Sequence, residues 1–295
     1  MIEETGVVGA KILKISEYVD EITPELSISL DQVASIIDGQ HRLKGLEEAK
    51  QGEFELSVSI FVGADDATEA MIFSVVNLAQ TKVNRSLVYD LFSLATSRSP
   101  EKTCHEIVVA LDQMDESPFK NRIKRLGVAT EGRFGETLSQ ATIVKGILPY
   151  ITDDPLADRD RGKRFGFWEP SLARDLGKRI FYEFFRRGED VKILDNLLNY
   201  FNAVRAKWPS AWEGTGTGNI LNRTNGFNGL IRFLRPAYLN CTSEPRVVSQ
   251  EEFARVFAPV RLQDGDFNPQ TFVPGSSGAS LLFHTLVDQS QIPIP

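Results

Sequence analysis

The residues Asp38-Gly39-Gln40-His41-Arg42 are the part of this chain whose types and order best suit chemistry on an anion. They follow the apolar run VASII and precede the helical pattern LKGLEEAK, so Gly39 falls at a turn that leads into a helix. A glycine at such a turn lets backbone N–H groups approach an anion, and the helix start adds about half a positive charge. His41 and Arg42 add donors, and an arginine can hold two phosphate oxygens at once. The segment therefore predicts a phosphate-binding turn.

A structural interpretation of the same residues stays open. Asp38 suits an N-cap, Gly39 a turn, and Arg42 a solvated charge on the surface. An accidental occurrence of all five letters is rare, about once in ten thousand chains of this length. The mechanics of the motif alone do not decide between a binding turn and a structural one.

The segments around the motif predict a compact α/β unit that ends near residue 98. Leu43, Leu46 and Ala49 are at helical spacing, and further helices are expected from about Asp66 to Leu78 and from about Ser86. Strands are expected in the runs rich in Ile, Val and Phe, which are LSISL, VASII and FELSVSIFV.

Beyond residue 98 the pattern becomes helical. The charged segment 153–167 and the glycine-rich EGTGTGNI predict loops, and the tail after about residue 240 has no clear pattern. The aromatic residues of FYEFF and NYFNAVRAKW match helical spacing and are expected in the core. We therefore expect an α+β fold, with an α/β domain over 1–98 and a mainly helical domain over 99–295. Helices are expected in HEIVVALDQM, QATIVKGILPYI, SLARDLGKRIFYEFFRR and VKILDNLLNYFNAVRAKW.

Several stretches resemble one known family. Asp38 to Arg42, followed by Leu43, Gly45 and Leu46, resembles the signature of the DGQHR-domain proteins. These include DndB of the DNA phosphorothioation systems and related components of deazaguanine DNA-modification clusters. NLAQTKV at 77–83 resembles the family's second characteristic stretch, and NYFNAVRAKWPSAW and NRTNGFNGLIRFL resemble its C-terminal helical portion. The resemblance spans roughly residues 33 to 235.

The family is similar in turn to the ParB and sulfiredoxin superfamily, where a strand, a glycine turn ending in arginine, and a helix bind nucleotide phosphates. This resemblance implies a ParB/sulfiredoxin-like N-terminal unit in which Asp38, His41 and Arg42 are the catalytic candidates. Asp38 would orient water or a cation. The residues implied in nucleotide binding are Gly39, Gln40, His41, Arg42, Asn77, Gln80 and Lys82.

Two departures from these relatives limit the chemistry that we expect. Sulfiredoxins carry their reactive cysteine where this chain has Gln40, and an amide is not a thiol nucleophile, so thiol phosphoryl transfer is not expected. Val76 stands where the ParB stretch has an acidic residue before its asparagine, so no metal-ligand residue is assigned there.

Two functions are compatible with these residues. The first is a nucleotide-binding, ATP-hydrolysing accessory protein of a DNA-modification or phage-defence system, a weak nucleoside triphosphatase. It would bind ATP or another nucleoside triphosphate, with or without Mg²⁺; a cation between Asp38 and the polyphosphate would relieve their repulsion. The alternative is a non-enzymatic DNA-binding transcriptional regulator of such a locus. The net charge of −7 and the lack of a helix-turn-helix pattern weigh against this alternative.

Clusters of basic residues are the candidate DNA contacts. The cluster that we assign to DNA binding follows a Pro118-Phe119 turn and consists of Lys120, Arg122, Lys124 and Arg125. Two further basic clusters lie at 159–164 and 178–187, where a solvated helix face balanced by acids is the competing interpretation.

The composition and the N-terminal pattern limit which cellular location and which partners we expect. No stretch reaches the roughly 18 apolar residues of a membrane span, and the acidic start MIEETGVVGAKILK does not have the pattern of a signal peptide. Two cysteines, Cys104 and Cys241, stand in no metal or disulfide spacing. We therefore expect a cytoplasmic protein without a structural metal. Its expected partners are a nucleotide, with DNA, other proteins of a DNA-modification system, and a second copy of the chain as further candidates.

Overall fold

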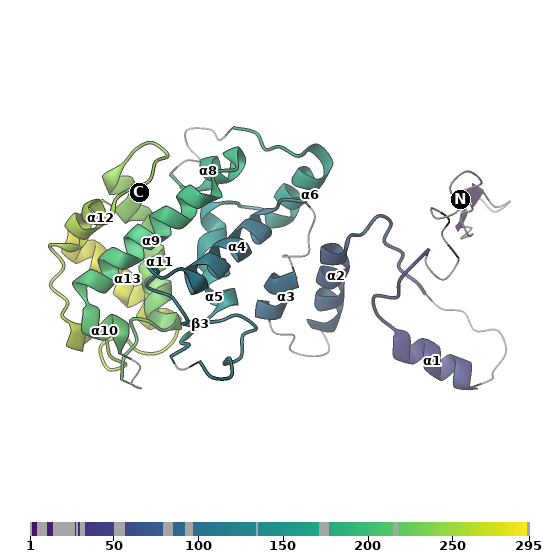
Figure 1. The fold of residues 1–295 in the computed structure, drawn as a ribbon, viewed down its shortest axis with the longest axis horizontal. Helices are drawn as coiled ribbons and strands as arrows, with labels where there is room; N and C mark the ends of the chain where they lie inside the picture. The colour runs from purple at the N-terminus through teal and green to yellow at the C-terminus, as the bar shows by residue number, and fades with distance from the viewer. Residues whose placement is uncertain are drawn as a thin grey trace.

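The computed structural model describes residues 2–4, 11–13, 27, 29, 33–49, 57–78, 85–91, 97–133, 135–170, 177–214 and 218–293. The architecture is a helix-rich α+β fold. Most helices form one body, and α1 (Gln40–Ala49) and α2 (Asp66–Leu78) extend from it, with α3 (Arg85–Leu91) between α2 and the body (Figure 1). These three helices agree with the helices expected from the sequence.

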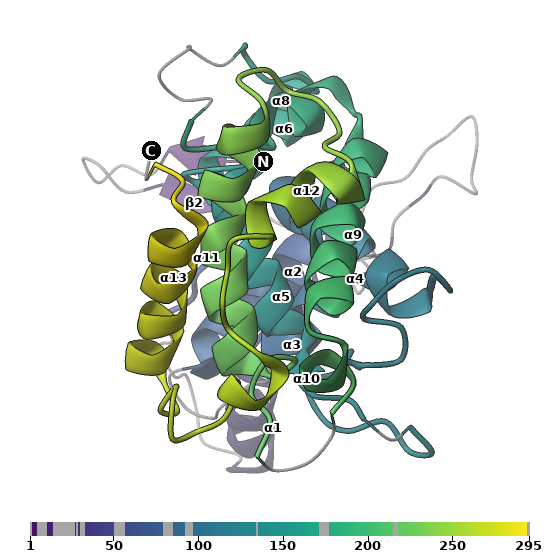
Figure 2. The same ribbon diagram turned by 90° about the vertical axis from the view of Figure 1, so that its left-hand side faces the viewer.

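The body is built on two long helices, α9 (Asp190–Lys207) and α11 (Thr224–Cys241). Figure 2 shows α11 flanked by α13 (Ser276–Ser290) on one side and by α9 and α12 (Gln250–Phe257) on the other. Helices α4 (Pro100–Gln113) and α5 (Gln140–Ile147) pack against each other and against α9 and α11 respectively. The other described helices of the body are α6 (Pro155–Phe165), α8 (Tyr182–Arg187) and α10 (Pro209–Glu213), with 3₁₀ turns at Leu148–Tyr150 and Asp264–Asp266.

Aromatic side chains fill the core, as their helical spacing predicts. Phe119 packs edge-to-face on Phe201 at 4.7 Å and on Trp212 at 5.3 Å between ring centroids. Buried tyrosine and tryptophan side chains have hydrogen-bond partners; for example, the Tyr200 hydroxyl donates to the Leu230 carbonyl at 2.7 Å. Because these aromatic groups are both packed and hydrogen-bonded, the body has a uniquely arranged core.

Strands are few and short in the described residues. An antiparallel pair joins β1 (Ile2–Glu4) to β2 (Lys11–Leu13), with Ile2 opposite Leu13. A parallel pair joins β3 (Ile123–Lys124) to β4 (Leu138–Ser139).

The strands expected next to the motif are not formed where the structure describes them. Residues 33–37 of VASII and 57–62 of FELSVSIFV are irregular, as are residues 27 and 29 of LSISL. A strand needs a neighbour to pair its N–H and C=O groups. Here Ile36 and Val58 are exposed, so the described residues of these apolar runs pack on no sheet. The prediction of strands in these described positions is wrong.

The prediction of a loop over residues 153–167 is also wrong, because most of this segment forms α6. Asp154 caps the helix by accepting from the Ala157 N–H at 3.0 Å, Pro155 occupies the first turn, and Gly166 ends it at φ +70°. The helix packs closely at Gly162, where a Cβ would come within 3.0 Å of the Arg98 carbonyl and the Trp168 ring. Local capping and this contact outweigh the charged composition that predicted a loop.

The tail after residue 240 contains two further helices. Ser249 and Glu252 form a capping box at the start of α12, and α13 packs against α11. The described part of the predicted helix SLARDLGKRIFYEFFRR is helical only over α8. Within the described residues, no helix combines the length and the apolar character that a membrane crossing requires.

Candidate functional site

The motif turn has the backbone conformation that its glycine predicts. Gly39 has φ +99°, a value that side chains other than glycine rarely adopt. Its carbonyl accepts from the N–H groups of Arg42 and Leu43, both at 3.0 Å, and so begins α1. The Gln40 side-chain amide donates to the Ile36 carbonyl at 2.9 Å and ties the helix start to the preceding segment. The first N–H groups of the helix, at Gln40 and His41, have no partner within the helix and are available to an anion.

The charged residues of the motif gather at the same turn. The Arg42 guanidinium lies 3.5 Å from an Asp38 carboxylate oxygen, and the Arg42 side chain is 76% exposed. The Arg42 side chain folds back over the turn: its Nη2 atom would lie only 3.6 Å from a Cβ placed on Gly39. His41 is exposed on the first turn of the helix. The motif therefore has an exposed guanidinium, an exposed imidazole, a partly exposed carboxylate and helix N–H groups within one turn of the chain.

The second predicted stretch lies mostly outside the described residues. Gln80 and Lys82 belong to that part, and only the backbone of Asn77 is described, in the last turn of α2. A hydrogen bond that sequence reasoning missed joins the segment before the motif to the start of α2: the Ser35 hydroxyl donates to Glu69 at 2.9 Å. Asn77 lies eight residues beyond Glu69, about 12 Å along the helix. The described contact is therefore with the opposite end of α2, and no motif in the sequence indicated it.

The start of α2 is anchored to α6 through a charged cluster. Lys163 Nζ donates to Asp65 at 2.8 Å and also contacts the Thr68 hydroxyl. Asp65 also caps the start of α2, since the same carboxylate oxygen accepts from the Thr68 N–H at 3.0 Å. Burial acts to raise the pKa of Asp65, but the hydrogen bonds from Lys163 and Thr68 outweigh it and lower the pKa from 3.8 to about 2.

Replacing Lys163 by methionine should destabilise the fold by about 1 kcal/mol at neutral pH. Because the folded pKa of Asp65 is lowered, the pair stabilises the fold above about pH 4 and loses this effect as the pH falls toward 2. The difference in unfolding free energy between wild type and variant should therefore shrink over that range, as measured by urea titrations. Lys192→Met, which removes an exposed partner of Glu189, is the matched control. A difference that stays constant from pH 7 to pH 2.5 contradicts the assignment.

Most of the predicted DNA contacts are engaged within the protein. Arg125 pairs with Asp90 at 2.9 Å and donates to Gln140 at 2.8 Å. Arg122 pairs with Glu213, and Lys120 pairs with Asp115. Lys124 is half-buried on β3 and forms no ion pair with a described residue. Three of the four cations therefore have carboxylate partners that a DNA phosphate would have to replace.

Two shallow, open surface pockets lie away from the motif. One, of about 390 Å³, is at the end of α11, around Cys241 and Arg246, and one of about 260 Å³ lies between α10 and Asp264. No group of three or more His, Cys, Asp or Glu side chains in the described part of the chain is arranged to hold a metal ion.

Comparisons with known proteins add no relative: no protein-family model, no curated protein and no solved structure matches this chain. The resemblance of the motif to the DGQHR-domain family therefore stays a prediction from the sequence, and so does the ParB-like character of the N-terminal unit. The turn before α1 is therefore the feature of the described residues from which we infer a function.

Proposed function

We propose that this chain binds the phosphates of a nucleoside triphosphate at the turn before α1 and hydrolyses the bound nucleotide slowly. The observation that carries the proposal is the conformation of Gly39, whose φ of +99° begins a helix with an exposed arginine folded over it. A residue other than glycine would be strained at this φ. The turn thus combines helix N–H donors with a forked cation, as phosphate binding requires.

A phosphate is able to replace Asp38 as the partner of Arg42. The present ion pair is long, at 3.5 Å, and the arginine is largely exposed, so it stabilises the turn by no more than about 1 kcal/mol. A forked contact between arginine and phosphate contributes about 1.5 to 3 kcal/mol. The exchange is therefore favourable, and it releases the Asp38 carboxylate beside the bound phosphates.

The released carboxylate needs a cation or a water molecule between itself and the nucleotide. Mg²⁺ is usually bound by one or two carboxylates together with the phosphates of its substrate, and Asp38 suits such a role. Asp38 would hold such a cation together with the phosphates, or would orient the attacking water. His41, next to Arg42 on the first helical turn, is placed to donate to a phosphate oxygen.

Replacing Arg42 by alanine should weaken triphosphate binding roughly tenfold or more, because it removes the charge-assisted contact. Calorimetric titrations with ATP, CTP and GTP, each with and without Mg²⁺, measure this effect and identify the base. Lys44→Ala is the matched control, since it removes an exposed cation from the same helix outside the turn. Equal affinities of Arg42→Ala and wild type, with circular dichroism unchanged, would sink the proposal.

Hydrolysis is tested with Asp38→Asn, which keeps the shape of the side chain and removes its charge. We expect the variant to bind the triphosphate and to lose Mg²⁺-dependent phosphate release. If the wild type releases no phosphate from any triphosphate, alone or with DNA, the chain is a nucleotide-binding protein and the enzymatic part of the proposal is wrong.

The biological setting that we propose is a DNA-modification or phage-defence system, where the protein would act with DNA and with other proteins of that system. Its support is the resemblance of residues 38–46 and 77–83 to the DGQHR-domain family. The competing function, a DNA-binding regulator, receives less support, because Arg122 and Arg125 of the assigned DNA cluster are paired with carboxylates.

A further inference from the structure

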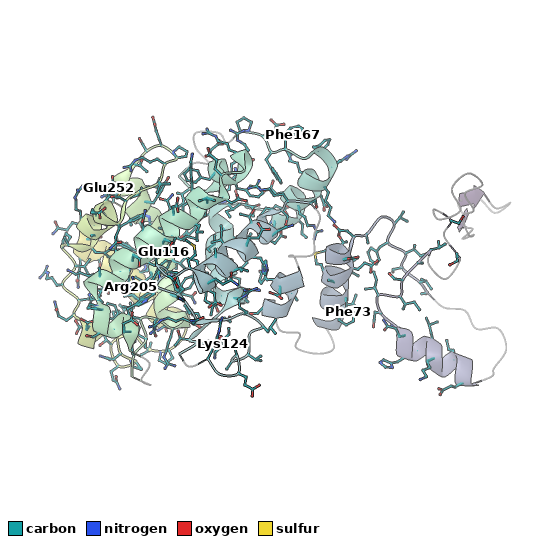
Figure 3. The ribbon with its side chains drawn as sticks, in the orientation of Figure 1. Phe73, Glu116, Lys124, Phe167, Arg205 and Glu252 are labelled. Carbon is teal, nitrogen blue, oxygen red and sulfur yellow. The ribbon has the colours of Figure 1, made fainter. Side chains whose placement is uncertain are left out.

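Two phenylalanines at the end of α6 are exposed where the chain leaves the helix. Phe165 is the last helical residue, Gly166 turns the chain at φ +70°, and Phe167 follows. Their side chains are 57% and 55% exposed, and their ring centroids lie 6.1 Å apart. Figure 3 shows Phe167 at the edge of the body, beside α6. Two aromatic rings, tilted 52° to each other, are therefore exposed to the solvent side by side.

The neighbouring Trp168 shows that the fold itself does not require this exposure. Its ring is buried, packs on Phe185 at 4.5 Å and donates from Nε1 to the Asp158 carbonyl at 2.9 Å. This single residue anchors the segment after α6 to the body. Burying a phenylalanine stabilises a protein by about 1.5 to 3 kcal/mol, so two exposed rings next to a satisfied anchor indicate a surface that contacts something else.

Positive charge accompanies the two rings. Arg161 lies one helical turn before Phe165 and on the same face, and it has no ion pair with any described residue. The Arg164 guanidinium lies 5.4 Å from the centre of the Phe165 ring. The other basic residues of α6 are engaged, since Arg159 pairs with Asp160 and Lys163 with Asp65. Arg161 and Arg164 are thus the free cations of this helix among the described residues.

We infer that Phe165, Phe167, Arg161 and Arg164 form a binding surface for single-stranded nucleic acid, which we call the α6 platform. Unpaired bases stack on exposed aromatic rings regardless of sequence, and arginines beside them bind the phosphates. Glu169, two residues beyond Phe167, is exposed and would repel a backbone on that side. The phosphates are therefore expected along Arg161 and Arg164. In Figure 1 the platform lies well apart from the motif turn on α1, so it is a second site.

Charge and shape select this ligand over the alternatives. A duplex hides the faces of its bases, so it offers the rings nothing to stack on. A membrane surface would need a continuous apolar face, and the exposed side of α6 carries Asp160, Arg161 and Arg164 between its apolar residues. A strand with free bases and a regular negative charge matches both the rings and the arginines.

The platform is tested by fluorescence anisotropy of the full chain with labelled oligothymidylate and oligouridylate of about 12 nucleotides. Changing both Phe165 and Phe167 to alanine should weaken binding by about tenfold or more, since each stacked base contributes a factor of about five or more. The Phe165→Leu, Phe167→Leu variant should be similarly weak, because leucine keeps the apolar surface and loses the aromatic face. Changing both to tryptophan should retain or improve the affinity.

The arginines are tested by the salt dependence. Two phosphate contacts to a single strand correspond to a slope of about −1.4 in log affinity against log salt, and Arg161→Ala with Arg164→Ala should remove that amount. Arg255→Ala with Arg261→Ala, two exposed arginines elsewhere on the body, changes the net charge equally and should leave the slope unchanged.

Any of three results would overturn the inference. The first is that neither oligonucleotide binds at about 50 mM salt. The second is that both the alanine and the leucine variants bind as the wild type does, and the third is that a duplex of equal length binds more tightly. Association with anionic vesicles that the leucine variant retains would assign the platform to a membrane surface instead. Thermal unfolding followed through the near-ultraviolet signal of Trp168 and its neighbours verifies that each variant is folded.

Discussion

Replacing Gly226 by alanine should lower the free energy of unfolding by about 3 kcal/mol or more. A Cβ at this position would lie within 3.0 Å of three backbone atoms, the carbonyl oxygen of Ile220 and the oxygen and Cα of Leu221. Backbone atoms cannot rotate away as a flexible side chain does, so the loop before α11 or the helix itself must shift.

Such a shift is costly because the next residue of α11, Phe227, is packed in the aromatic core. Phe227 stacks on Phe201 with centroids 5.6 Å apart and planes 11° from parallel, and both rings are buried in the core. The Gly226 N–H also donates to the Ile220 carbonyl at 3.2 Å, a bond that the displaced loop would lose. The cost therefore combines steric strain, a lost hydrogen bond and disturbed aromatic packing.

Unfolding of the wild type and of the Gly226→Ala variant in urea or guanidinium measures this loss of stability. The matched control is Gly265→Ala, since a Cβ at Gly265 meets no atom within 4 Å and should change the stability by less than about 1 kcal/mol. Similar stabilities of the two variants would show that the loop at Ile220 and Leu221 adjusts without cost, and the packing argument would be wrong.

Replacing Arg133 by methionine should cost about 3 kcal/mol, the second large effect that we expect. Arg133 Nη1 donates to Asp112 at 2.8 Å and lies 3.6 Å from Glu136, and both carboxylate side chains are only 1% exposed. The hydrogen bond to Asp112 raises the pKa of the guanidinium. Without Arg133, two buried carboxylates lose their shared counter-charge, and an unpaired buried charge is strongly destabilising.

Lys120→Met is the control for this prediction. Its partner Asp115 is 86% exposed, so losing that pair should cost less than about 1 kcal/mol. Chemical unfolding of both variants at neutral pH provides the comparison. If Arg133→Met is no less stable than Lys120→Met, water or a side-chain rearrangement must already solvate Asp112 and Glu136, and the buried-charge argument is wrong.

Local signals in the sequence predicted the helices well. The acidic start and apolar spacing of 66–78 match α2, and the pattern of VKILDNLLNYFNAVRAKW matches α9. Helix formation depends on residues three or four apart and on caps, so a short window contains the information. The same holds for α6, whose start at Asp154-Pro155 and stop at Gly166 are readable locally, although its charged composition led to the prediction of a loop.

The candidate site was also predictable in its local part. The order Asp38, Gly39, Arg42 indicated a turn at the start of a helix, and the positive φ of Gly39 and the contact between Asp38 and Arg42 agree with it. The strand expected before the turn did not follow from the same signal. VASII has the composition of a strand, but a strand exists only when a second segment pairs with it, and no short window specifies that partner.

By itself, therefore, the sequence determined the contacts that span a few residues: the helices, their caps, the turn at Gly39 and the apolar faces of the core. Only the tertiary structure decided which charges are free, because an ion pair depends on residues that are distant in the chain. Arg125 meets Asp90 across 35 positions and Lys163 meets Asp65 across 98, which removes them from the basic clusters seen in the sequence. The tertiary structure also decided which of three neighbouring aromatic residues is buried. Trp168 is buried because it packs against Phe185, whereas Phe165 and Phe167 stay exposed.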